Sequence, residues 1–362
     1  MDRRPVDADV VVVGGGPAGS AAAIACATRG LSVVMCEREP PGRDRPGETL
    51  HPGIEPLLRQ LGIADRLADA IGARHPGIWI EWGGPRRFEA FGGDAGGPWT
   101  GFQVWRADFD VLLLERAREL GVDVRQPCAV TGALMRDGIF HGIETAEGPI
   151  AARMAVDASG ATRWLGRALD VASPARSPRL IARYGYMEGS CPACDDAPSL
   201  VGDASGWTWT ALVRPKLYQW TRVSFDGPPR SDWTPPQLLG LTPRARSRGA
   251  DVTWRMAGQA AGPGWFMVGD AAAMLDPTSS HGVLKAIMSG MMAGHLIAGV
   301  LGGRAPAEAT AATYHDWLAG WFSTDATRLA RFYCELGVDF GDRRASTNSR
   351  AGATALLRTS AR

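Results

Sequence analysis

Three glycines stand at the spacing that binds the phosphates of a dinucleotide. Gly14, Gly16 and Gly19 form a Gly-x-Gly-x-x-Gly pattern directly after the apolar run Ala8–Val13 and at the start of an alanine-rich segment. The first glycine of such a pattern makes a tight turn, the second lets a pyrophosphate approach the backbone, and the third lets the following helix pack on the strand. Free N–H groups at the start of that helix attract phosphate. Glu37 ends the next apolar run, where it is placed to accept hydrogen bonds from a ribose.

A second segment favours FAD over NAD as the dinucleotide. Residues 264–272 read as an apolar strand that leads into Gly269 and Asp270 and then into a helix. A carboxylate at such a turn can hold the hydroxyl chain of a ribityl group, which FAD carries. Capping a helix N-terminus is the alternative role for Asp270. Beside the glycine pattern near the N-terminus, the ribityl role is favoured.

With both segments in place, residues 8 to 300 resemble the FAD-dependent aromatic hydroxylases, the flavin-dependent halogenases and the geranylgeranyl-reductase-like flavoproteins. Motifs at 105–110, 157–163 and 276–282 look like an Arg-x-x-Phe-Asp helix start, an Asp-Gly-type motif and an Asp-Pro…Gly segment beside the flavin ring. The FAD-binding residues predicted from the spacing and from the resemblance are Gly14, Gly16, Ala18, Gly19, Glu37, Arg38, Arg45, Thr49, Arg106, Val130, Asp270, Gly282 and Val283.

The order of predicted elements indicates an α/β fold. The resemblance implies a Rossmann-type FAD-binding domain, like that of the group A flavin monooxygenases, with an inserted β-rich substrate domain and a helical C-terminus. We expect the FAD-binding domain to comprise residues 1–75, 101–168 and 258–312, and the substrate domain 76–100 and 169–257. A C-terminal helical segment follows at 313–362. One helix is expected over 51–67, from its apolar spacing.

Two further segments resemble particular branches of this superfamily. Residues 45–50, Arg-Pro-Gly-Glu-Thr-Leu, are similar to a Gly-Glu-Ser/Thr loop of halogenases and of the flavoproteins that mature peptidyl tryptophan quinones. Trp207 and Trp209 resemble the first half of a halogenase Trp-x-Trp-x-Ile-Pro motif, whose Ile-Pro half is missing here. Two tryptophans at i and i+2 can equally be one face of a strand. On the Gly-Glu-Thr-Leu loop and the Asp-Pro-x-Ser-x-x-Gly-Val-Leu-Lys-Ala run at 276–286, the chain most resembles the maturation flavoproteins.

Two departures argue against halogenation. Halogenases resemble one another in a lysine shortly before a glycine, and that lysine acts on hypohalous acid. The matching stretch here is His75-Pro76-Gly77, and no lysine precedes Lys216. Tryptophan halogenases also carry a glutamate where this chain has Ser279. We therefore expect a monooxygenase that hydroxylates an aromatic substrate, protein- or peptide-bound tryptophan included, through a flavin C4a-hydroperoxide. A reductase of C=C bonds, a halogenase and a partner-binding flavoprotein with little catalysis remain alternatives.

The remaining candidate side chains leave their roles open. His281 and His51 are the candidate catalytic acid or base near the flavin, and a neutral packing histidine is the alternative for each. Lys285 is a phosphate or flavin neighbour, or a solvated helix residue. Six tryptophans either line an aromatic pocket or fill a β core: Trp79, Trp82, Trp99, Trp207, Trp209 and Trp220. Without a second Gly-x-Gly-x-x-Gly, electrons come from NAD(P)H bound transiently or from a separate flavin reductase.

Composition limits the other classes of partner. The 39 basic and 38 acidic residues leave a net charge of +1, so nothing in the balance points to nucleic acid or a membrane. Cys191 and Cys194 form a single Cys-x-x-Cys without a second pair, so we predict incidental thiols and no metal site. No apolar stretch of about 18 residues and no signal peptide is expected, which makes the cytoplasm the predicted location.

Overall fold

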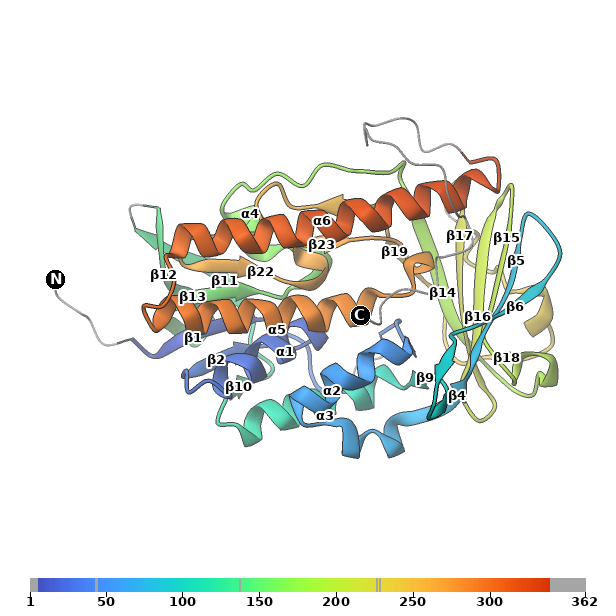
Figure 1. Cartoon of the computed structure of the whole chain (residues 1–362), viewed down its shortest axis with the longest axis horizontal. Coiled ribbons are helices and arrows are strands. Elements are labelled where there is room, and N and C mark those ends of the chain that lie inside the picture. Colours follow the sequence, from blue (N-terminus) through green and yellow to red (C-terminus); the bar gives the residue numbers. More distant parts are fainter. Residues whose placement is uncertain (1–5, 43–44, 137, 226, 228, 339–362) are drawn as a thin grey trace.

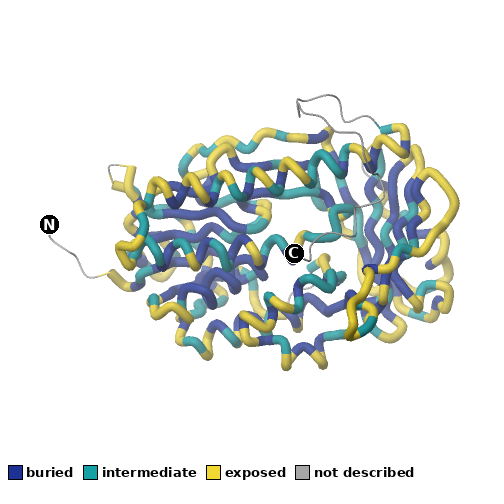
Figure 2. The backbone as a smooth tube through the Cα atoms, in the orientation of Figure 1, coloured by how far each residue is buried: buried dark blue, intermediate teal, exposed yellow. Residues whose placement is uncertain are grey.

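The structure is a computed structural model, and it describes residues 6–42, 45–136, 138–225, 227 and 229–338. Two large sheets lie toward opposite ends of the molecule (Figure 1). Long helices cover the first sheet, and one of them continues to the second. The buried strands of both sheets form the interior, while the outward faces of the helices and the loops are exposed (Figure 2).

The first sheet holds the phosphate-binding turn, and its strand order is β10-β2-β1-β13-β12-β11. β1 runs parallel to both β2 and β13. β22 also runs parallel to β13, on the side of β13 away from β1. Val10, Val11 and Val12 are fully buried at the centre, as expected for a parallel strand covered on both faces. The strands are β1 (Ala8–Val13), β2 (Val33–Cys36), β10 (Asp123–Arg125), β11 (Val130–Arg136), β12 (Ile139–Thr145), β13 (Gly148–Asp157), β21 (Ala261–Gly262) and β22 (Trp265–Met267).

The second sheet has the order β18-β14-β17-β16-β15-β5-β6, with β19 paired to β14. Most of its pairs are antiparallel, but β5 runs parallel to β15 and so joins an early segment of the chain to a late one. The strands are β5 (Gly77–Trp82), β6 (Arg87–Ala90), β14 (Ile181–Glu188), β15 (Ser199–Asp203), β16 (Gly206–Arg214), β17 (Leu217–Ser224), β18 (Thr242–Pro243) and β19 (Arg248–Asp251).

Three small sheets connect these parts. β3 and β4 flank β9, which places Thr49 opposite Gln103. β7 pairs with β8 and β20 with β23. Their strands are β3 (Thr49–Leu50), β4 (Ile71–His75), β7 (Gly93–Asp94), β8 (Gly97–Pro98), β9 (Gly101–Val104), β20 (Arg255–Met256) and β23 (Ala273–Met274).

The described residues also form six α-helices: α1 (Pro17–Ala27), α2 (Glu55–Leu61), α3 (Arg106–Glu119), α4 (Trp164–Ala168), α5 (Gly282–Leu301) and α6 (Ala307–Cys334). α5 is long and apolar enough to cross a membrane by length and composition, so the prediction that no stretch reaches this limit is wrong. Here α5 packs on α1. A Cβ at Gly290 would lie 2.2 Å from the Ala18 carbonyl oxygen, and one at Gly294 would lie 2.6 Å from the Ala25 Cβ. The small residues therefore let two helix backbones touch, as in a core helix.

The long helix α6 ties the two sheets together (Figure 1). Near its C-terminal end, Phe332 stacks on Trp82 of β5 with ring centroids 4.0 Å apart. The neighbouring Tyr333 hydroxyl accepts a hydrogen bond from the Trp207 indole at 2.7 Å. Both tryptophans are almost fully buried. α6 therefore fixes the second sheet against the helices that cover the first.

The α/β fold class with a Rossmann-type FAD-binding part and a helical C-terminal part is confirmed, but two predicted helices are wrong. The helix expected over 51–67 ends at Leu61, because Gly62 turns the backbone to a φ of +75°. The helix expected directly after Gly269 is a single 3-10 turn, Gly269–Ala271. Residues 339–362 of the predicted C-terminal segment lie outside the described residues.

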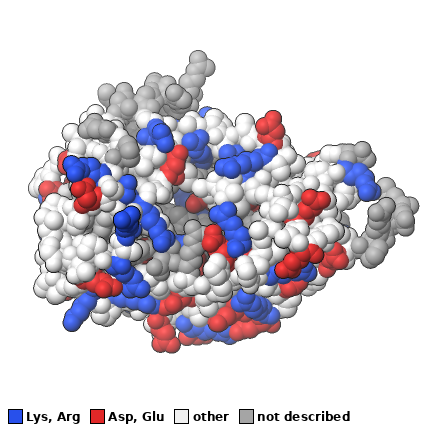
Figure 3. Space-filling view, turned by 180° about the vertical axis from the view of Figure 1, so that it is seen from behind, with Lys and Arg blue, Asp and Glu red and all other residues white. Residues whose placement is uncertain are grey.

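One face of the molecule shows how its charged side chains are distributed. On the face seen in Figure 3, basic and acidic side chains are interspersed rather than gathered into separate patches. This agrees with the near-zero net charge. Recognition must therefore come from a particular site and not from the field of the whole molecule.

Candidate active site

The turn between β1 and α1 is built by its glycines. Gly14 has a φ of +109°, and a Cβ there would lie 2.4 Å from the Ala158 carbonyl oxygen. A Cβ at Gly19 would lie 1.9 Å from the Gly14 carbonyl oxygen. A Cβ at Gly16 meets only the Arg45 guanidinium, at 3.7 Å. The first and third glycines are therefore required by the fold, while the second faces open space.

Glu37 closes the other side of this cradle. Its carboxylate accepts hydrogen bonds from the backbone N–H of Gly15 at 2.7 Å and of Glu39 at 2.9 Å. The Arg45 guanidinium lies 3.6 Å from the same carboxylate and also faces Gly16. The structure thus brings a cation and a row of backbone N–H groups to the place predicted for a pyrophosphate.

Two other predicted FAD ligands lie around the end of β2. Val130 begins β11, two residues after Cys128, whose N–H donates to the Glu37 carbonyl oxygen at 2.7 Å. Arg38 is exposed, and its guanidinium lies 3.6 Å from the Glu39 carboxylate. Val130 is therefore beside the cradle, whereas the Arg38 side chain is directed to solvent.

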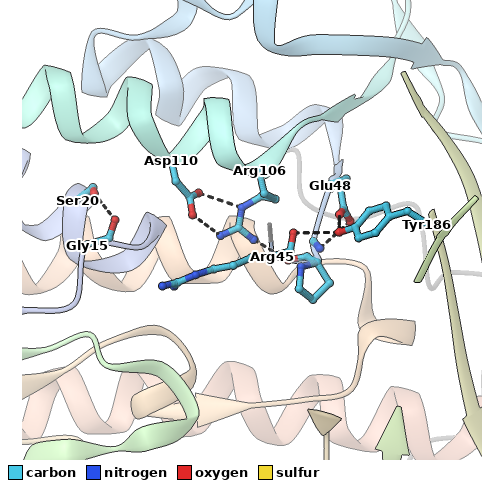
Figure 4. Close-up of polar contacts among 9 residues, drawn as sticks. Gly15, Ser20, Arg45, Glu48, Arg106, Asp110 and Tyr186 are labelled. Carbon is cyan, nitrogen blue, oxygen red and sulfur yellow. Dashed lines mark hydrogen bonds and ion pairs between the residues drawn. The ribbon is translucent and has the colours of Figure 1, made fainter. Parts of the chain in front are cut away.

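Arg106, at the start of α3, is held in a fixed orientation (Figure 4). Its guanidinium makes two hydrogen bonds of 3.0 Å to the Asp110 carboxylate and donates to the Pro46 carbonyl oxygen at 2.8 Å. Burial alone would lower the pKa of Arg106, but Asp110 and then Glu48 raise it above its usual value. A permanent, oriented cation is thus fixed beside the loop that carries Arg45.

That loop is anchored to the second sheet. Tyr186 of β14 donates a hydrogen bond to the carboxylate of Glu48, which is almost fully buried (Figure 4). The Gly47 N–H donates to the other carboxylate oxygen at 2.9 Å. Burial raises the pKa of Glu48, against the opposing effect of the Tyr186 hydroxyl. Thr49 follows and donates to the Gln103 side chain at 2.9 Å.

Asp270 is where the fit to FAD is clearest. Its side chain is accessible from the outside, yet protein surrounds it closely enough for burial to raise its pKa, an effect that Arg106 opposes. An accessible carboxylate at the bottom of a recess is what a polyhydroxyl chain needs as an acceptor. Together with the open face of Gly16, this recess fits the ribityl-pyrophosphate part of FAD.

The N-terminus of α5 lies next to this recess. Gly282 is the first helical residue, and a Cβ there would meet nothing within 4 Å. Val283 lies against the loop, because its side chain is 3.5 Å from the position that a Cβ at Gly47 would take. Ala18 is likewise 2.9 Å from the position that a Cβ at Gly269 would take.

The turn before α5 is held by Asp276. Asp276 is fully buried and accepts hydrogen bonds from the Trp254 indole at 2.5 Å and the Thr278 N–H at 2.9 Å. These contacts fix the turn that precedes the helix.

The two candidate catalytic histidines lie together. The ring centroids of His51 and His281 are 5.0 Å apart. The His51 Nδ1 accepts the Gly53 N–H at 3.0 Å, so only its Nε2 is left for chemistry. Burial lowers the pKa of His51, and burial followed by the charge on His51 lowers that of His281 to about 3. Both rings are therefore neutral near pH 7, and the lowered pKa values make each a weaker base than a free imidazole.

His75 lies in the stretch that was matched to the halogenase lysine, and both nitrogens of its ring make hydrogen bonds. Its Nδ1 donates to the Gly77 carbonyl oxygen at 3.0 Å, which leaves Nε2 to accept from the Gln103 amide at 3.1 Å. Gln103 in turn accepts from Thr49. Only 2% of His75 is exposed, and burial lowers its pKa to about 4. His75 is therefore a structural residue that holds β3, β4 and β9 together.

A cavity of about 370 Å³ opens between α5, α6 and β5, within the range of roughly 300–1,000 Å³ typical of small-molecule sites. A smaller cavity of about 20 Å³ contains Gly269, Asp270 and Gly282. Three residues line both: Ser279, Lys285 and Trp321. The large cavity thus adjoins the FAD recess. Its walls include His51, Ile78, Ile80, Leu200, His281, Leu284, Met288, Trp317, Arg328, Leu329 and Phe332.

Sequence reasoning missed the aromatic side chains of this cavity. Trp317 and Trp321 of α6 line it, whereas none of the six tryptophans considered from the sequence does. Lys285 is not a solvated helix residue: only 19% of its side chain is exposed, and it lines both cavities. A helical spacing of four between Trp317 and Trp321 was the available signal, since it places both on one helix face.

The Cys-x-x-Cys segment lies apart from this site. The sulfurs of Cys191 and Cys194 are 2.9 Å apart in a 3-10 turn beside Tyr218. Among the residues that the structure describes, no three His, Cys, Asp or Glu side chains come together as metal ligands.

The fold and the site define an FAD-dependent oxidoreductase, and comparison with known proteins gives its family. An FAD-binding domain model matches residues 7–163, and a tryptophan halogenase model matches 99–324, more than half of the chain. The chain therefore belongs to the tryptophan halogenase family, and FAD is its cofactor.

Individual relatives agree with this assignment. This chain is 27% identical to a tryptophan 2-halogenase of Chondromyces crocatus, over 91% of this chain and 69% of the relative. It is 27% identical to a 1H-pyrrole-2-carbonyl-[peptidyl-carrier protein] brominase of Pseudoalteromonas luteoviolacea, over 92% of the chain and 87% of the relative. A triple mutant of the flavin-dependent brominase Bmp2 superposes with a TM-score of 0.81 at 25% identity, covering 93% of this chain and 91% of the brominase.

These findings correct the predicted reaction. The prediction of aromatic hydroxylation is wrong, because the family model and the three relatives named above are halogenases or brominases. The resemblance to the superfamily of FAD-dependent aromatic hydroxylases and flavin-dependent halogenases is confirmed. The absence of a lysine at position 75 was therefore a poor guide to the family.

Proposed function

We propose that this protein is a flavin-dependent halogenase that acts on an electron-rich aromatic substrate held in the cavity between α5, α6 and β5. The observation that carries the proposal is the wall of Ser279, Lys285 and Trp321, shared by this cavity and the FAD recess. A halogenating agent formed at the flavin meets an aromatic ring across that wall. Bound FAD, once reduced, supplies hypohalous acid from O₂ and halide.

The protein's own residues hold the two reactants apart from water. Arg45, Arg106 and Asp270 are placed to bind the cofactor's polar parts. Trp317 and Trp321 offer flat apolar surfaces on which an aromatic ring can stack. Apolar side chains around the cavity exclude water, which would otherwise dilute and consume hypohalous acid.

The relatives' names suggest which substrates to try. One relative acts on tryptophan and another on a pyrrole carried by a peptidyl carrier protein. For this chain we propose an indole- or pyrrole-like ring, either free or presented on a peptide or carrier protein. Electrons are proposed to come from a separate flavin reductase, because the sequence holds a single dinucleotide-binding pattern.

The test supplies the FAD-loaded protein with a flavin reductase, NADH, O₂ and bromide, together with tryptophan, indole or a carrier-bound pyrrole carboxylate. Mass spectrometry should show a product with the bromine isotope doublet that disappears when bromide is omitted. The Gly16→Val variant is the control without bound cofactor. A halide-independent oxygenated product, or a substrate reduced in the absence of O₂, would overturn the proposal.

A further inference from the structure

Lys285 occupies an unusual place for a lysine. It is one of only two lysines in the chain, and it lies on the first turn of α5. Only 19% of its side chain is exposed, and it lines both the large cavity and the flavin-side cavity. The other lysine, Lys216, is exposed on the turn between β16 and β17. Lys285 is therefore the only amine side chain that reaches the boundary between the two spaces.

The surroundings of Lys285 control its proton. The Asp325 carboxylate of α6 contacts the Lys285 ammonium, and the Trp321 ring lies 4.2 Å from the nitrogen. Arg328 and His281 are the other titratable groups facing it. Burial, and then the charge of Arg328, lowers the pKa of Lys285 to about 7. Asp325 and Trp321 favour the protonated form, so near neutral pH Lys285 is present both as the neutral amine and as the ammonium.

Other nucleophilic side chains near the cavity are less suited to the same task. His75 uses both ring nitrogens in hydrogen bonds and does not line the cavity. His51 has one nitrogen occupied by the Gly53 N–H and lines only the large cavity. Cys191 and Cys194 are not part of either cavity.

We propose that Lys285 is the catalytic amine that takes the halogen from hypohalous acid on the flavin side and presents it to the aromatic ring in the large cavity. The inference rests on the proposed halogenase function and adds the residue that carries the halogen. It also explains how a chain with His75 in place of a lysine can belong to this family.

The steps balance without a further reactant. The neutral Lys285 nitrogen attacks the halogen of hypohalous acid; the N–halogen bond forms, the O–halogen bond breaks, and the N–H proton leaves with hydroxide as water. The ring carbon then attacks the halogen; the C–halogen bond forms and the N–halogen bond breaks. The electron pair of the N–halogen bond stays on the Lys285 nitrogen, and the ring carbon is oxidised by two electrons as the halogen is reduced by two. The ring proton passes to the Lys285 nitrogen, either directly or by way of the Asp325 carboxylate. The amine is thereby restored.

The first test does not depend on turnover. The FAD-loaded, oxidised protein is treated near neutral pH with trinitrobenzenesulfonate, which modifies unprotonated amines, and separately with stoichiometric hypobromous acid. Peptide mass mapping should show Lys285 modified faster than Lys216 by the first reagent and N-brominated by the second. Faster modification of Lys216 than Lys285, or no bromine on Lys285, would overturn the proposal.

The second test separates this inference from the proposed function. Lys285→Arg keeps the charge beside Asp325 but removes the nucleophilic amine, and Lys216→Arg is the matched control. In Lys285→Arg, FAD content and flavin oxidation should stay at the parent level. Halogenated product should fall by about 100-fold, and a β-diketone trap should collect hypohalous acid in the bulk. Parent-level halogenation by Lys285→Arg would contradict the role proposed for Lys285 but would not contradict the halogenase function. If the parent protein itself gives no halogenated product, the proposed function fails, whatever the labelling shows.

Discussion

Tyr186 of the second sheet donates a hydrogen bond to the carboxylate of Glu48, and this contact joins the two halves of the site. Glu48 is buried on the loop whose Arg45 faces the phosphate cradle and whose Pro46 carbonyl receives Arg106. A hydroxyl from the sheet beside the substrate cavity therefore holds the loop that contacts the cofactor. A substitution in the second sheet at this contact should therefore alter the cofactor loop as well.

Tyr186→Phe should weaken both the fold and the binding of FAD. The substitution leaves one oxygen of a buried carboxylate without its donor, a loss of about 1–3 kcal/mol in the free energy of unfolding. FAD affinity should fall as well, because the Arg45–Glu48 loop loses its anchor. Urea denaturation and FAD titration measure the two effects. Tyr184→Phe, on the same strand but without a hydrogen bond from its hydroxyl among the described residues, is the control. Equal behaviour of the two variants would contradict the anchoring role.

Gly16→Val and Gly19→Val should fail in different ways. A side chain at Gly16 faces open space and Arg45, so the variant should fold but be unable to admit the pyrophosphate. A Cβ at Gly19 would collide with the Gly14 carbonyl, so that variant should not reach the native fold. Circular dichroism and flavin absorbance distinguish the outcomes. A folded, fully yellow Gly16→Val protein would remove the glycine turn from the FAD site.

Acid should destabilise the protein through His75. Its pKa lies near 4 in the folded state, below the usual 6.5. As the pH falls below about 6.5, the unfolded chain binds a proton at His75 and the folded chain does not, so the free energy of unfolding decreases until about pH 4. The slope contributed by this residue is about 1.4 kcal/mol per pH unit. Urea denaturation at several pH values measures it, and His75→Gln should flatten the profile. His141→Gln, at an exposed position, should keep the parent's slope. An unchanged slope in His75→Gln would contradict the argument.

The FAD-binding half of the site was predictable because its chemistry is local. Gly14, Gly16, Gly19 and Glu37 lie within 24 residues, and a strand–turn–helix pattern fixes their geometry. The glycines at 14 and 19 could not be replaced without a backbone collision, so their spacing carries the prediction.

The substrate half was not predictable in the same way. Its cavity is assembled from Ile78 of β5, Lys285 of α5 and Trp321 of α6, which only the tertiary packing brings together. No spacing along the chain relates these residues. The reaction was misjudged because one position, residue 75, was used to exclude halogenation, whereas the match to the halogenase family extends over residues 99–324. The single turn after Gly269 was likewise taken for a helix, because local pattern cannot show where a turn is cut short.

Gly282→Leu should reduce turnover far more than it reduces FAD affinity. Gly282 starts α5 at the flavin-side cavity, and no protein atom lies within 4 Å of the position of its Cβ. The fold therefore has room for a side chain, which would occupy space needed by the cofactor's reactive end, while the cradle at Gly16 and Glu37 still binds the other end. Displacing reacting atoms by about 1 Å can cost on the order of 100-fold in rate, and that is the expected fall in product per bound flavin. Gly299→Leu is the matched control, since it also faces open space but lies near the far end of the same helix. Product formation per bound flavin, measured by mass spectrometry against flavin absorbance, decides the matter: a parent-like ratio in Gly282→Leu would place the reacting end of the cofactor away from this helix.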